Sequence, residues 1–382
     1  MTTIVCIEDL RRLACRRVPK MFYDYADGGS WSERTYRENE AALGKIRFRQ
    51  RVGVNIETRN LTTELVGQRV SMPVVLAPIG MCGMQHADGE ILAARAAEAF
   101  GAPFCLSTMS ICSIEDVAAH TNKPFWFQLY VMRDRQFVVQ LIERARAAQC
   151  SALVVTLDLQ IIGDRHKDVR NGLSAPPRMT PRTIFDLLTR PRWCLSMLKT
   201  PRRYFGNIVG HVAGVSDMRS LSDWTNSQFD PTMTWEDIAW IRKLWKGPLI
   251  LKGVMEKEDA QRSIDVGADA IVVSNHGGRQ LDGAPATIEV LPRIVDSVGD
   301  RVEIFFDGGV RSGQDVLRAV ALGARGVLIG RAYVYGLGAM GEAGVTHCLG
   351  IIQRELSLAM GFCGRTDIES VGRDILFDVE EG

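Results

Sequence analysis

The feature that most constrains this chain is an eightfold alternation of short apolar runs and helical segments after residue 72. The runs are almost continuously apolar, which is typical of strands buried on both faces of a parallel sheet. They cover residues 73–77, 103–107, 125–130, 152–157, 248–252, 270–274, 302–306 and 326–329. The segments between them carry apolar residues at helical spacing, for example at 88–100, 133–149, 235–245, 257–266, 314–322 and 342–360.

Eight strand–helix units predict an α/β protein with a TIM (β/α)8 barrel, within a single domain over residues 1–382. A doubly wound open sheet is the alternative, because the number of strands does not show whether the sheet closes. Residues 1–70 predict an N-terminal helical extension that covers the bottom or the side of the barrel. Residues 159–233 form an insertion after the fourth strand, far longer than the usual connection. Helices are expected in the extension at 7–17, 20–26 and 32–43.

Composition excludes several classes of protein. The chain is 46% hydrophobic and has a net charge of +1, which gives no general attraction for nucleic acid. The start of the chain carries charged residues where an export signal needs an apolar stretch, so we expect a cytoplasmic protein. Its nine cysteines form no C-x-x-C pair, which argues against a disulfide framework and against a bound metal.

Polar residues or glycines stand at or just beyond the carboxyl ends of all eight runs. In a parallel barrel these ends meet at one face, where ligands bind. Each residue taken singly has a structural explanation, such as capping the next helix, but their coincidence favours a ligand site. The residues at these ends are Gly80, Ser107, Gln128, Tyr130, Thr156, Asp158, Lys252, Ser274, His276, Asp307, Gly330 and Arg331.

Two of these ends predict a phosphate site. The seventh run is followed by DGGVRSG at 307–313, which contains Gly308, Gly309 and Arg311, and the eighth is followed by Gly330 and Arg331. Barrels build phosphate sites after these two strands from backbone N–H groups and a helix N-terminus. Arginines at the same place add charge-assisted hydrogen bonds to phosphate.

The densest polar cluster is SNHGGRQLD at 274–282. His276 is followed by two glycines, and Arg279 stands three residues on, where its guanidinium could grip a carboxylate. Asp158 and Arg165 follow the fourth run and are expected to reach the same face. The cluster therefore predicts a base beside a site for an anionic substrate.

With these motifs the chain resembles the FMN-dependent L-2-hydroxy-acid dehydrogenases and oxidases, and in particular the bacterial respiratory flavin L-lactate dehydrogenases. SNHGGRQLD is the signature of that family, and the likeness extends over nearly the whole chain. Further motifs that carry the resemblance are FYDYADGG at 22–29, APIG at 77–80, FQLY at 127–130, TLD at 156–158 and LKG at 251–253.

The resemblance implies a role for each matching residue. His276 would be the base and Asp158 its carboxylate partner, while Arg279 and Arg165 would hold the substrate carboxylate. Histidine suits this role because its pKa lies near neutrality. Tyr25 and Tyr130 would hydrogen-bond the substrate. The residues implied in FMN binding are Ala77, Pro78, Gly80, Ser107, Gln128, Thr156, Lys252, Ser274, Asp307, Gly308, Gly309, Arg311, Gly330 and Arg331.

The implied activity is oxidation of a small 2-hydroxy acid, L-lactate to pyruvate, with electrons passed to a quinone or a cytochrome. Gly80 stands where oxidases of the family tend to have Ala, and Met109 stands where plant glycolate oxidases have Trp. These departures favour an acceptor other than oxygen and a substrate other than glycolate. A mandelate-type dehydrogenase, a peroxide-forming oxidase and a catalytically silent phosphate-binding barrel are the alternatives. The resemblance also implies a homotetramer.

The insertion contains a basic and apolar stretch at 178–203. Seven cations against the single carboxylate of Asp186 give it a net charge of +6, and large apolar residues lie between them. Such a stretch is typical of a segment that lies on an anionic membrane, here the inner face of the cell membrane, although a helix packed on the barrel would read the same way. The cations are Arg178, Arg182, Arg190, Arg192, Lys199, Arg202 and Arg203.

Overall fold

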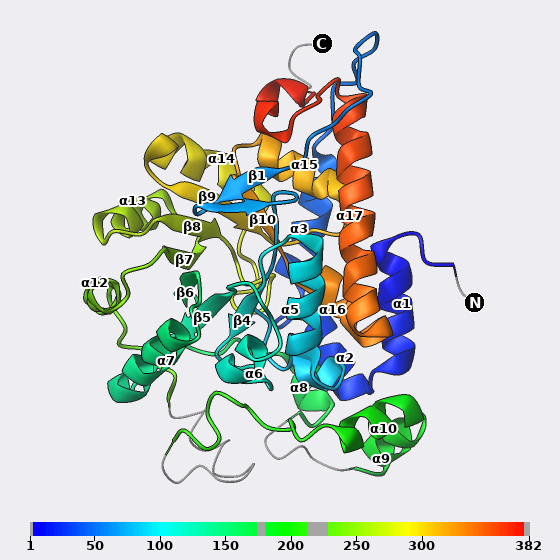
Figure 1. Ribbon diagram of the computed structural model, residues 1–382, viewed down its shortest axis with the longest axis vertical. Helices are drawn as coiled ribbons and strands as arrows, with labels where there is room; N and C mark the ends of the chain where they lie inside the picture. Colours follow the sequence, from blue (N-terminus) through cyan, green and yellow to red (C-terminus); the bar gives the residue numbers. More distant parts are fainter. Residues whose placement is uncertain (1–2, 174–179, 213–227, 378–382) are drawn as a thin grey trace.

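The computed structural model describes residues 3–173, 180–212 and 228–377. Its centre is an eight-stranded parallel sheet surrounded by helices (Figure 1). Every predicted apolar run overlaps one of these strands. The strands are β3 (Val74–Leu76), β4 (Cys105–Ser107), β5 (Trp126–Tyr130), β6 (Ala152–Thr156), β7 (Leu249–Val254), β8 (Ala270–Val273), β9 (Glu303–Asp307) and β10 (Gly326–Ile329).

The sheet closes on itself. Its strand order runs from β3 through β10 and down to β4, and a parallel bridge between Leu76 and Phe104 joins the two outermost strands. The backbone N–H of Leu76 donates to the carbonyl of Pro103 at 2.9 Å. This closure confirms the TIM barrel and excludes the open, doubly wound sheet.

Alternate residues along the strands build two apolar layers. Residues pointing inward, including Val75, Val154 and Leu328, form the interior of the barrel, where the rings of Trp126 and Phe305 meet edge to face at 5.7 Å. Residues pointing outward belong to a larger cluster shared with the surrounding helices. Because both faces of each strand are buried, the runs carry no polar alternation.

Each predicted barrel segment forms a helix, and four further helices were not among the predicted segments. Of these, α4 and α6 are short, α14 contains Pro292, and α16 contains Gly336 and Gly338. The helices after the first barrel strand are α4 (Cys82–Gln85), α5 (Gly89–Phe100), α6 (Ile114–Ala118), α7 (Arg135–Ala147), α12 (Trp235–Leu244), α13 (Lys257–Asp265), α14 (Thr287–Val298), α15 (Gly313–Ala321), α16 (Arg331–Met340) and α17 (Glu342–Phe362). Short 3-10 helices cover Gly299–Arg301, Ile368–Ser370 and Arg373–Ile375.

The N-terminal extension is not wholly helical. Helices α1 (Ile7–Arg17), α2 (Lys20–Asp27) and α3 (Arg34–Lys45) lie along the side of the barrel, and α1 packs on α16 and α17. A hairpin of β1 (Thr63–Leu65) and β2 (Gln68–Val70) then buries Leu65 and Val70 among the inward-pointing residues of the barrel. The extension therefore supplies both the side cover that we expected and a β-hairpin that we did not predict.

The insertion after β6 contains three described helices: α8 (His166–Arg170), α9 (Pro181–Leu188) and α10 (Pro191–Lys199). In Figure 1, α9 and α10 project from the body of the barrel beside α1 and α2. Arg178 lies outside the described residues. Within the described ranges, the structure contains no helix with the length and apolar character to cross a membrane.

Candidate active site

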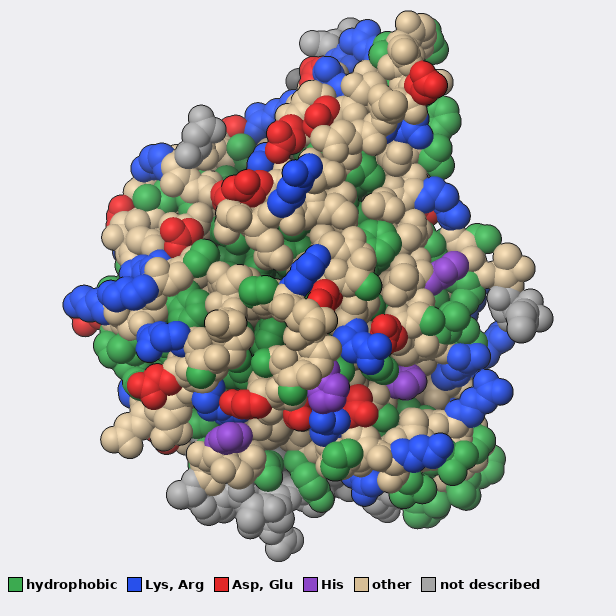
Figure 2. All heavy atoms as spheres, viewed as in Figure 1, with side chains coloured by type: hydrophobic (Ala, Val, Ile, Leu, Met, Phe, Trp, Pro, Cys, Tyr) green, Lys and Arg blue, Asp and Glu red, His purple; other side chains and the backbone are tan. Residues whose placement is uncertain are grey.

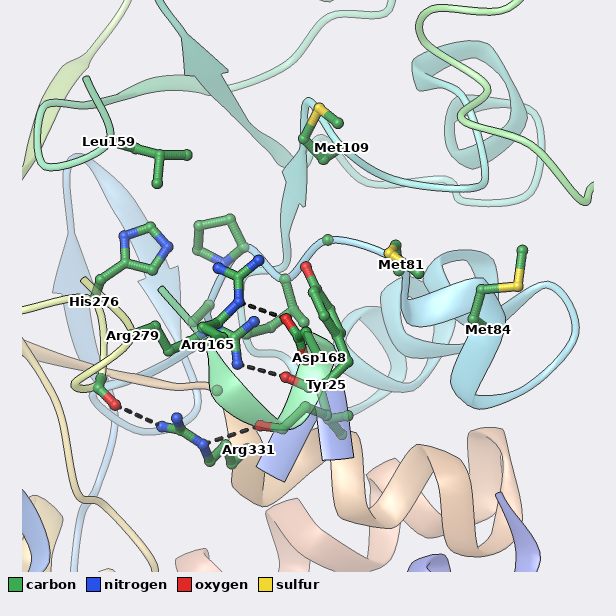
Figure 3. Close-up of a pocket in the computed structure, with 18 of the residues that line it drawn as sticks. Tyr25, Met81, Met84, Met109, Leu159, Arg165, Asp168, His276, Arg279 and Arg331 are labelled. Carbon is green, nitrogen blue, oxygen red and sulfur yellow. Dashed lines mark hydrogen bonds and ion pairs between the residues drawn. The ribbon is translucent and has the colours of Figure 1, made fainter. Parts of the chain in front are cut away.

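A cavity of about 690 Å³ opens at the carboxyl ends of the barrel strands (Figure 3). Most of the predicted site residues line it, although they come from segments far apart in the chain. The predicted residues on its wall are Tyr25, Ala77, Pro78, Gly80, Tyr130, Arg165, Lys252, His276, Arg279, Asp307, Gly308, Gly309, Arg311, Gly330 and Arg331.

Five predicted residues at the strand ends do not line the cavity. Asp158 is half-buried, and the other four are almost completely buried: Ser107, Gln128, Thr156 and Ser274. The Ser107 hydroxyl donates to the Gln128 amide oxygen at 3.0 Å, and the Lys252 ammonium donates to the Ser274 hydroxyl at 2.7 Å. The amide nitrogen of Gln128 is buried and has no hydrogen-bond partner within the described residues. A buried donor of this kind indicates a polar ligand group nearby.

The predicted base and carboxylate lie in direct contact. The Nδ1 atom of His276 is 2.8 Å from Oδ1 of Asp158. Burial raises the pKa of Asp158, but its contact with His276 and the nearby charge of Lys252 outweigh burial and hold that pKa below its ordinary value. An ionised carboxylate only accepts hydrogen bonds, so Nδ1 of His276 carries a hydrogen and donates it to Asp158. The lone pair of Nε2 in the same ring can then accept a proton.

Two local distortions of the backbone bring this pair together. His276 has φ +56°, a left-handed conformation that few residues other than glycine adopt and that often marks functional sites. Across the site, the ladder between β7 and β8 is irregular between Lys252 and Val254. At Gly253, within this irregularity, a Cβ atom would lie 2.8 Å from the Asp158 side chain. Glycine is therefore needed for Asp158 to approach the barrel so closely.

Three predicted site residues, Tyr25, Arg165 and Arg279, lie together at the centre of Figure 3. The guanidinium carbons of Arg279 and Arg165 lie 4.7 Å and 5.6 Å from the centre of the Tyr25 ring. Burial, followed by repulsion from Arg165, lowers the pKa of Arg279 to about 10. Two cations held this close favour a negatively charged ligand between or beside them.

The end of the cavity where the sequence predicts a phosphate site contains glycines and an enclosed arginine. Gly308 and Gly309 have φ values of +112° and +81°, which favour glycine. Arg331, the first residue of α16, donates to the carbonyls of Ala26, Gly28 and Gly277. A Cβ atom at Gly277 would lie 2.7 Å from this guanidinium, so a larger residue at position 277 would clash with the Arg331 side chain.

The pairing of charges around the cavity indicates what it binds. Arg203 is exposed to solvent, and four of the other basic side chains have carboxylate partners. Arg279 and Arg331 make no ion pair within the described residues, and they hydrogen-bond backbone carbonyls instead. Since an enclosed cation without a counter-charge is costly, the cavity is suited to two anionic groups. The four pairs are Lys252 with Asp307, Arg311 with Glu40, Arg165 with Asp168 and His276 with Asp158.

Sequence reasoning missed several residues that shape this site. Asp168 lines the cavity and pairs with Arg165, a contact that the three-residue spacing in a short helix could have suggested. Asn39 exchanges two side-chain hydrogen bonds of 2.9 Å with Asn275 and so ties α3 to the His276 loop. No local pattern in the sequence predicts the contact between Asn39 and Asn275.

Comparison with known proteins extends these observations to the whole chain. Residues 14–378 match the family described as FMN-dependent dehydrogenase. An L-lactate dehydrogenase of Caulobacter vibrioides (strain NA1000 / CB15N) is 47% identical over 370 residues, 96% of each protein. An L-lactate dehydrogenase of Pseudomonas syringae pv. syringae (strain B728a) is 44% identical over 369 residues, 96% of this chain and 97% of the relative.

Solved structures show the same architecture. The monotopic membrane protein (S)-mandelate dehydrogenase superposes with a TM-score of 0.94 at 36% identity, over 98% of this chain and 100% of that one. A mandelate oxidase with (S)-2-phenylpropionate superposes with a TM-score of 0.82 at 34% identity, over 98% of each chain. Because both the family match and the relatives span almost its full length, the chain belongs to the FMN-dependent dehydrogenase family.

Proposed function

We propose that the protein oxidises L-lactate to pyruvate and passes the electrons to a quinone or another acceptor that is not oxygen. The observation that carries this proposal is that His276, paired with Asp158, lines the same cavity as Arg279, which has no carboxylate partner among the described residues. A base beside a carboxylate holder is what oxidation of a 2-hydroxy acid requires. The two relatives named L-lactate dehydrogenase support lactate as the substrate.

FMN is the cofactor of the family, and the residues of this face fit it. Arg331, the glycines at 308 and 309 and the start of α16 would hold the phosphate. The unpartnered amide of Gln128 would donate to a carbonyl of the flavin ring. The Lys252 ammonium directs one N–H group to Asp307 and one to Ser274, which leaves a third that could donate to the flavin ring.

Bound FMN supplies the group that accepts two electrons from the substrate. Arg279 would hold the substrate carboxylate with its planar guanidinium, and Tyr25 and Tyr130 would hydrogen-bond the substrate. His276 would take a proton from the substrate at Nε2, because Nδ1 is held by Asp158. The ionised Asp158 would then stabilise the imidazolium that forms.

An aromatic 2-hydroxy acid such as mandelate is the second candidate. Its support is the (S)-mandelate dehydrogenase neighbour and the adaptable apolar wall of the cavity, which includes Met81, Met84 and Met109. Methionine side chains adjust to ligands of different shape. The identity of the acid is therefore a matter for direct comparison.

We expect L-lactate to bleach the visible absorbance of the anaerobic FMN-loaded enzyme faster than (S)-mandelate or glycolate, and D-lactate to leave it oxidised. Reduced enzyme should then be reoxidised by a soluble quinone analogue much faster than by air. The second expectation comes from Gly80, which stands where oxidases of the family tend to have Ala. A Cβ atom at this position would lie only 3.1 Å from the Tyr25 hydroxyl. Stopped-flow absorbance measures both steps.

Faster reduction by (S)-mandelate would assign the enzyme to the second candidate. Peroxide formed in air at the rate of substrate turnover would place it among the oxidases. No bleaching by any 2-hydroxy acid, with FMN bound, would contradict both candidates and favour the silent barrel.

We also propose that α9 and α10 contact an anionic membrane. Their inner face packs on the protein, since Trp193 stacks on Phe22 at 5.4 Å and donates to the carbonyl of Met84. Their outer face exposes apolar side chains, and Figure 2 shows hydrophobic and basic groups together in this region at lower right. The exposed apolar side chains are Ile184, Phe185, Leu188, Leu195 and Leu198.

The structure reduces the charge available for this contact. Arg202 pairs with Asp88 and Asp116 of the barrel. Arg190 pairs with Asp186 within the segment and also donates to the carbonyl of Val18, so both cations are engaged on the protein. The cations of α9, α10 and the turn beyond that stay exposed are Arg182, Arg192, Lys199 and Arg203. Each would contribute about 1 kcal/mol near an anionic surface.

We expect the enzyme to bind anionic liposomes at low salt and to dissociate as salt rises. Changing Arg182, Arg192 and Lys199 to Gln should weaken binding at least ~100-fold, because three terms of about 1 kcal/mol are lost. The matched control changes Lys243, Lys246 and Lys257, which are exposed on and beside α12 and α13, to Gln. Cosedimentation measures binding, and equal loss in both triple variants would overturn the assignment to α9 and α10.

A further inference from the structure

The ion pair between Arg165 and Asp168 fixes the charge of the substrate end of the cavity. Both residues line the cavity, and Nε of Arg165 donates to the Asp168 carboxylate at 2.6 Å. Helix α8 begins directly after Arg165, and Asp168 on that helix is only 8% exposed. A carboxylate so enclosed needs a partner, and the structure supplies the guanidinium of Arg165.

Arg279 is the second guanidinium at this end of the cavity. It lies on the same Tyr25 ring as Arg165, but its described hydrogen bonds go to backbone carbonyls and none to a carboxylate. His276 is likewise held by Asp158. Around Tyr25 the charges of Arg165 and Asp168 cancel, and Arg279 contributes one positive charge.

One net positive charge matches one carboxylate. A substrate with a second carboxylate would bring its extra negative charge near Asp168, while the positive charge of Arg165 is already balanced by that carboxylate. Repulsion between like charges in a half-buried site is strong enough to change affinity.

We propose that Asp168 is a specificity-determining residue that restricts the site to 2-hydroxy monocarboxylates and disfavours 2-hydroxy dicarboxylates. The proposal rests on the proposed function, since it takes this cavity to be the 2-hydroxy-acid site. Beyond that function, 2-hydroxy dicarboxylates are the substrates that the site would disfavour, and Asp168 is the residue responsible.

The test compares two unreactive anions of similar size, propionate with one carboxylate and malonate with two. Each is titrated into the FMN-loaded enzyme, and its dissociation constant is read from the change in flavin absorbance without turnover. In Asp168→Asn, the preference for propionate over malonate should fall by at least about 10-fold, because the negative charge that balances Arg165 and repels the second carboxylate is lost. Reduction of the variant by L-malate should rise relative to reduction by L-lactate in the same direction.

Two further variants test the charge argument. Asp164→Asn removes a carboxylate from the same segment, but Asp164 is exposed, does not line the cavity and pairs only weakly with His166 at 3.6 Å. Its propionate preference should equal that of the unchanged enzyme. Arg165→Gln leaves Asp168 without its partner and should shift the preference the opposite way, further toward propionate. Arg165→Gln decides the question if Asp168→Asn fails to retain FMN.

The outcomes separate this inference from the proposed function. An unchanged preference in Asp168→Asn, or an equal shift in Asp164→Asn, would overturn the role of Asp168 while leaving lactate oxidation intact. Failure of L-lactate to reduce the unchanged enzyme would instead overturn the proposed function. A shift in the same direction in Asp168→Asn and Arg165→Gln would show that the segment acts through its structure and not through its charge.

Discussion

The His276→Ala variant should keep its FMN and lose at least ~100-fold in the rate of anaerobic flavin reduction by L-lactate, the usual scale for loss of a general base. FMN should stay bound because the phosphate end is built from Arg331 and the glycine loop of residues 307–313, which do not depend on the imidazole. Stopped-flow absorbance measures the reduction rate, and the visible spectrum reports the bound cofactor.

Backbone strain is the confounding effect in this variant, because residue 276 has φ +56°. His276→Asn is the matched control, since asparagine tolerates the left-handed region but cannot act as a base near neutrality. Both variants should be equally slow. If His276→Asn reduced its flavin at nearly the original rate, the loss in His276→Ala would be due to the loop, and the base would lie elsewhere.

The barrel could be predicted because its strands are buried on both faces, so that each appears in the sequence as one apolar run. Elements without such a signature were missed. The strands β1 and β2 have three residues each, too few to show a period, and their role depends on where Leu65 meets the barrel interior. Pro292 within α14 argues locally against a helix that packing nevertheless maintains.

The site could be predicted to the extent that strand ends define it. A closed parallel sheet brings eight carboxyl ends to one face, so residues such as Lys252 and His276 had to lie near each other. The partners of these residues come from outside the repeat. Asp168 lies in the insertion and Asn39 in the N-terminal extension, and their contacts depend on how those segments fold back over the barrel.

The same distinction applies to the arginines. Glycines and arginines after the last two strands predicted a phosphate site, but the sequence did not show which guanidinium would be free. In the structure Arg311 is held by Glu40, whereas Arg331 has no carboxylate partner among the described residues and donates to carbonyl groups. We therefore expect Arg331 and Arg279 to contribute most to binding the anionic groups of the ligands, and the roles implied for Arg165 and Arg311 stay predictions.

Arg279→Lys should raise the KM for L-lactate by about 30-fold while changing the limiting rate of flavin reduction far less. An ammonium cannot form the paired hydrogen bonds of a guanidinium, and loss of one hydrogen bond to a charged group costs about 1.5–3 kcal/mol. The site penalises the new cation further, because burial and Arg165 already lower the pKa of Arg279 to about 10.

The same forces give this variant a pH dependence of defined sign. Lysine ordinarily titrates about two units below arginine, so burial beside Arg165 should bring the pKa of a lysine at this position toward neutrality. Above that pKa the side chain is neutral and no longer holds the carboxylate, so the KM should climb as pH rises in the alkaline range. The unchanged enzyme should show no such climb below pH about 9, since Arg279 stays charged there. A KM in Arg279→Lys that is both unchanged and independent of pH would show that the substrate carboxylate binds away from Arg279.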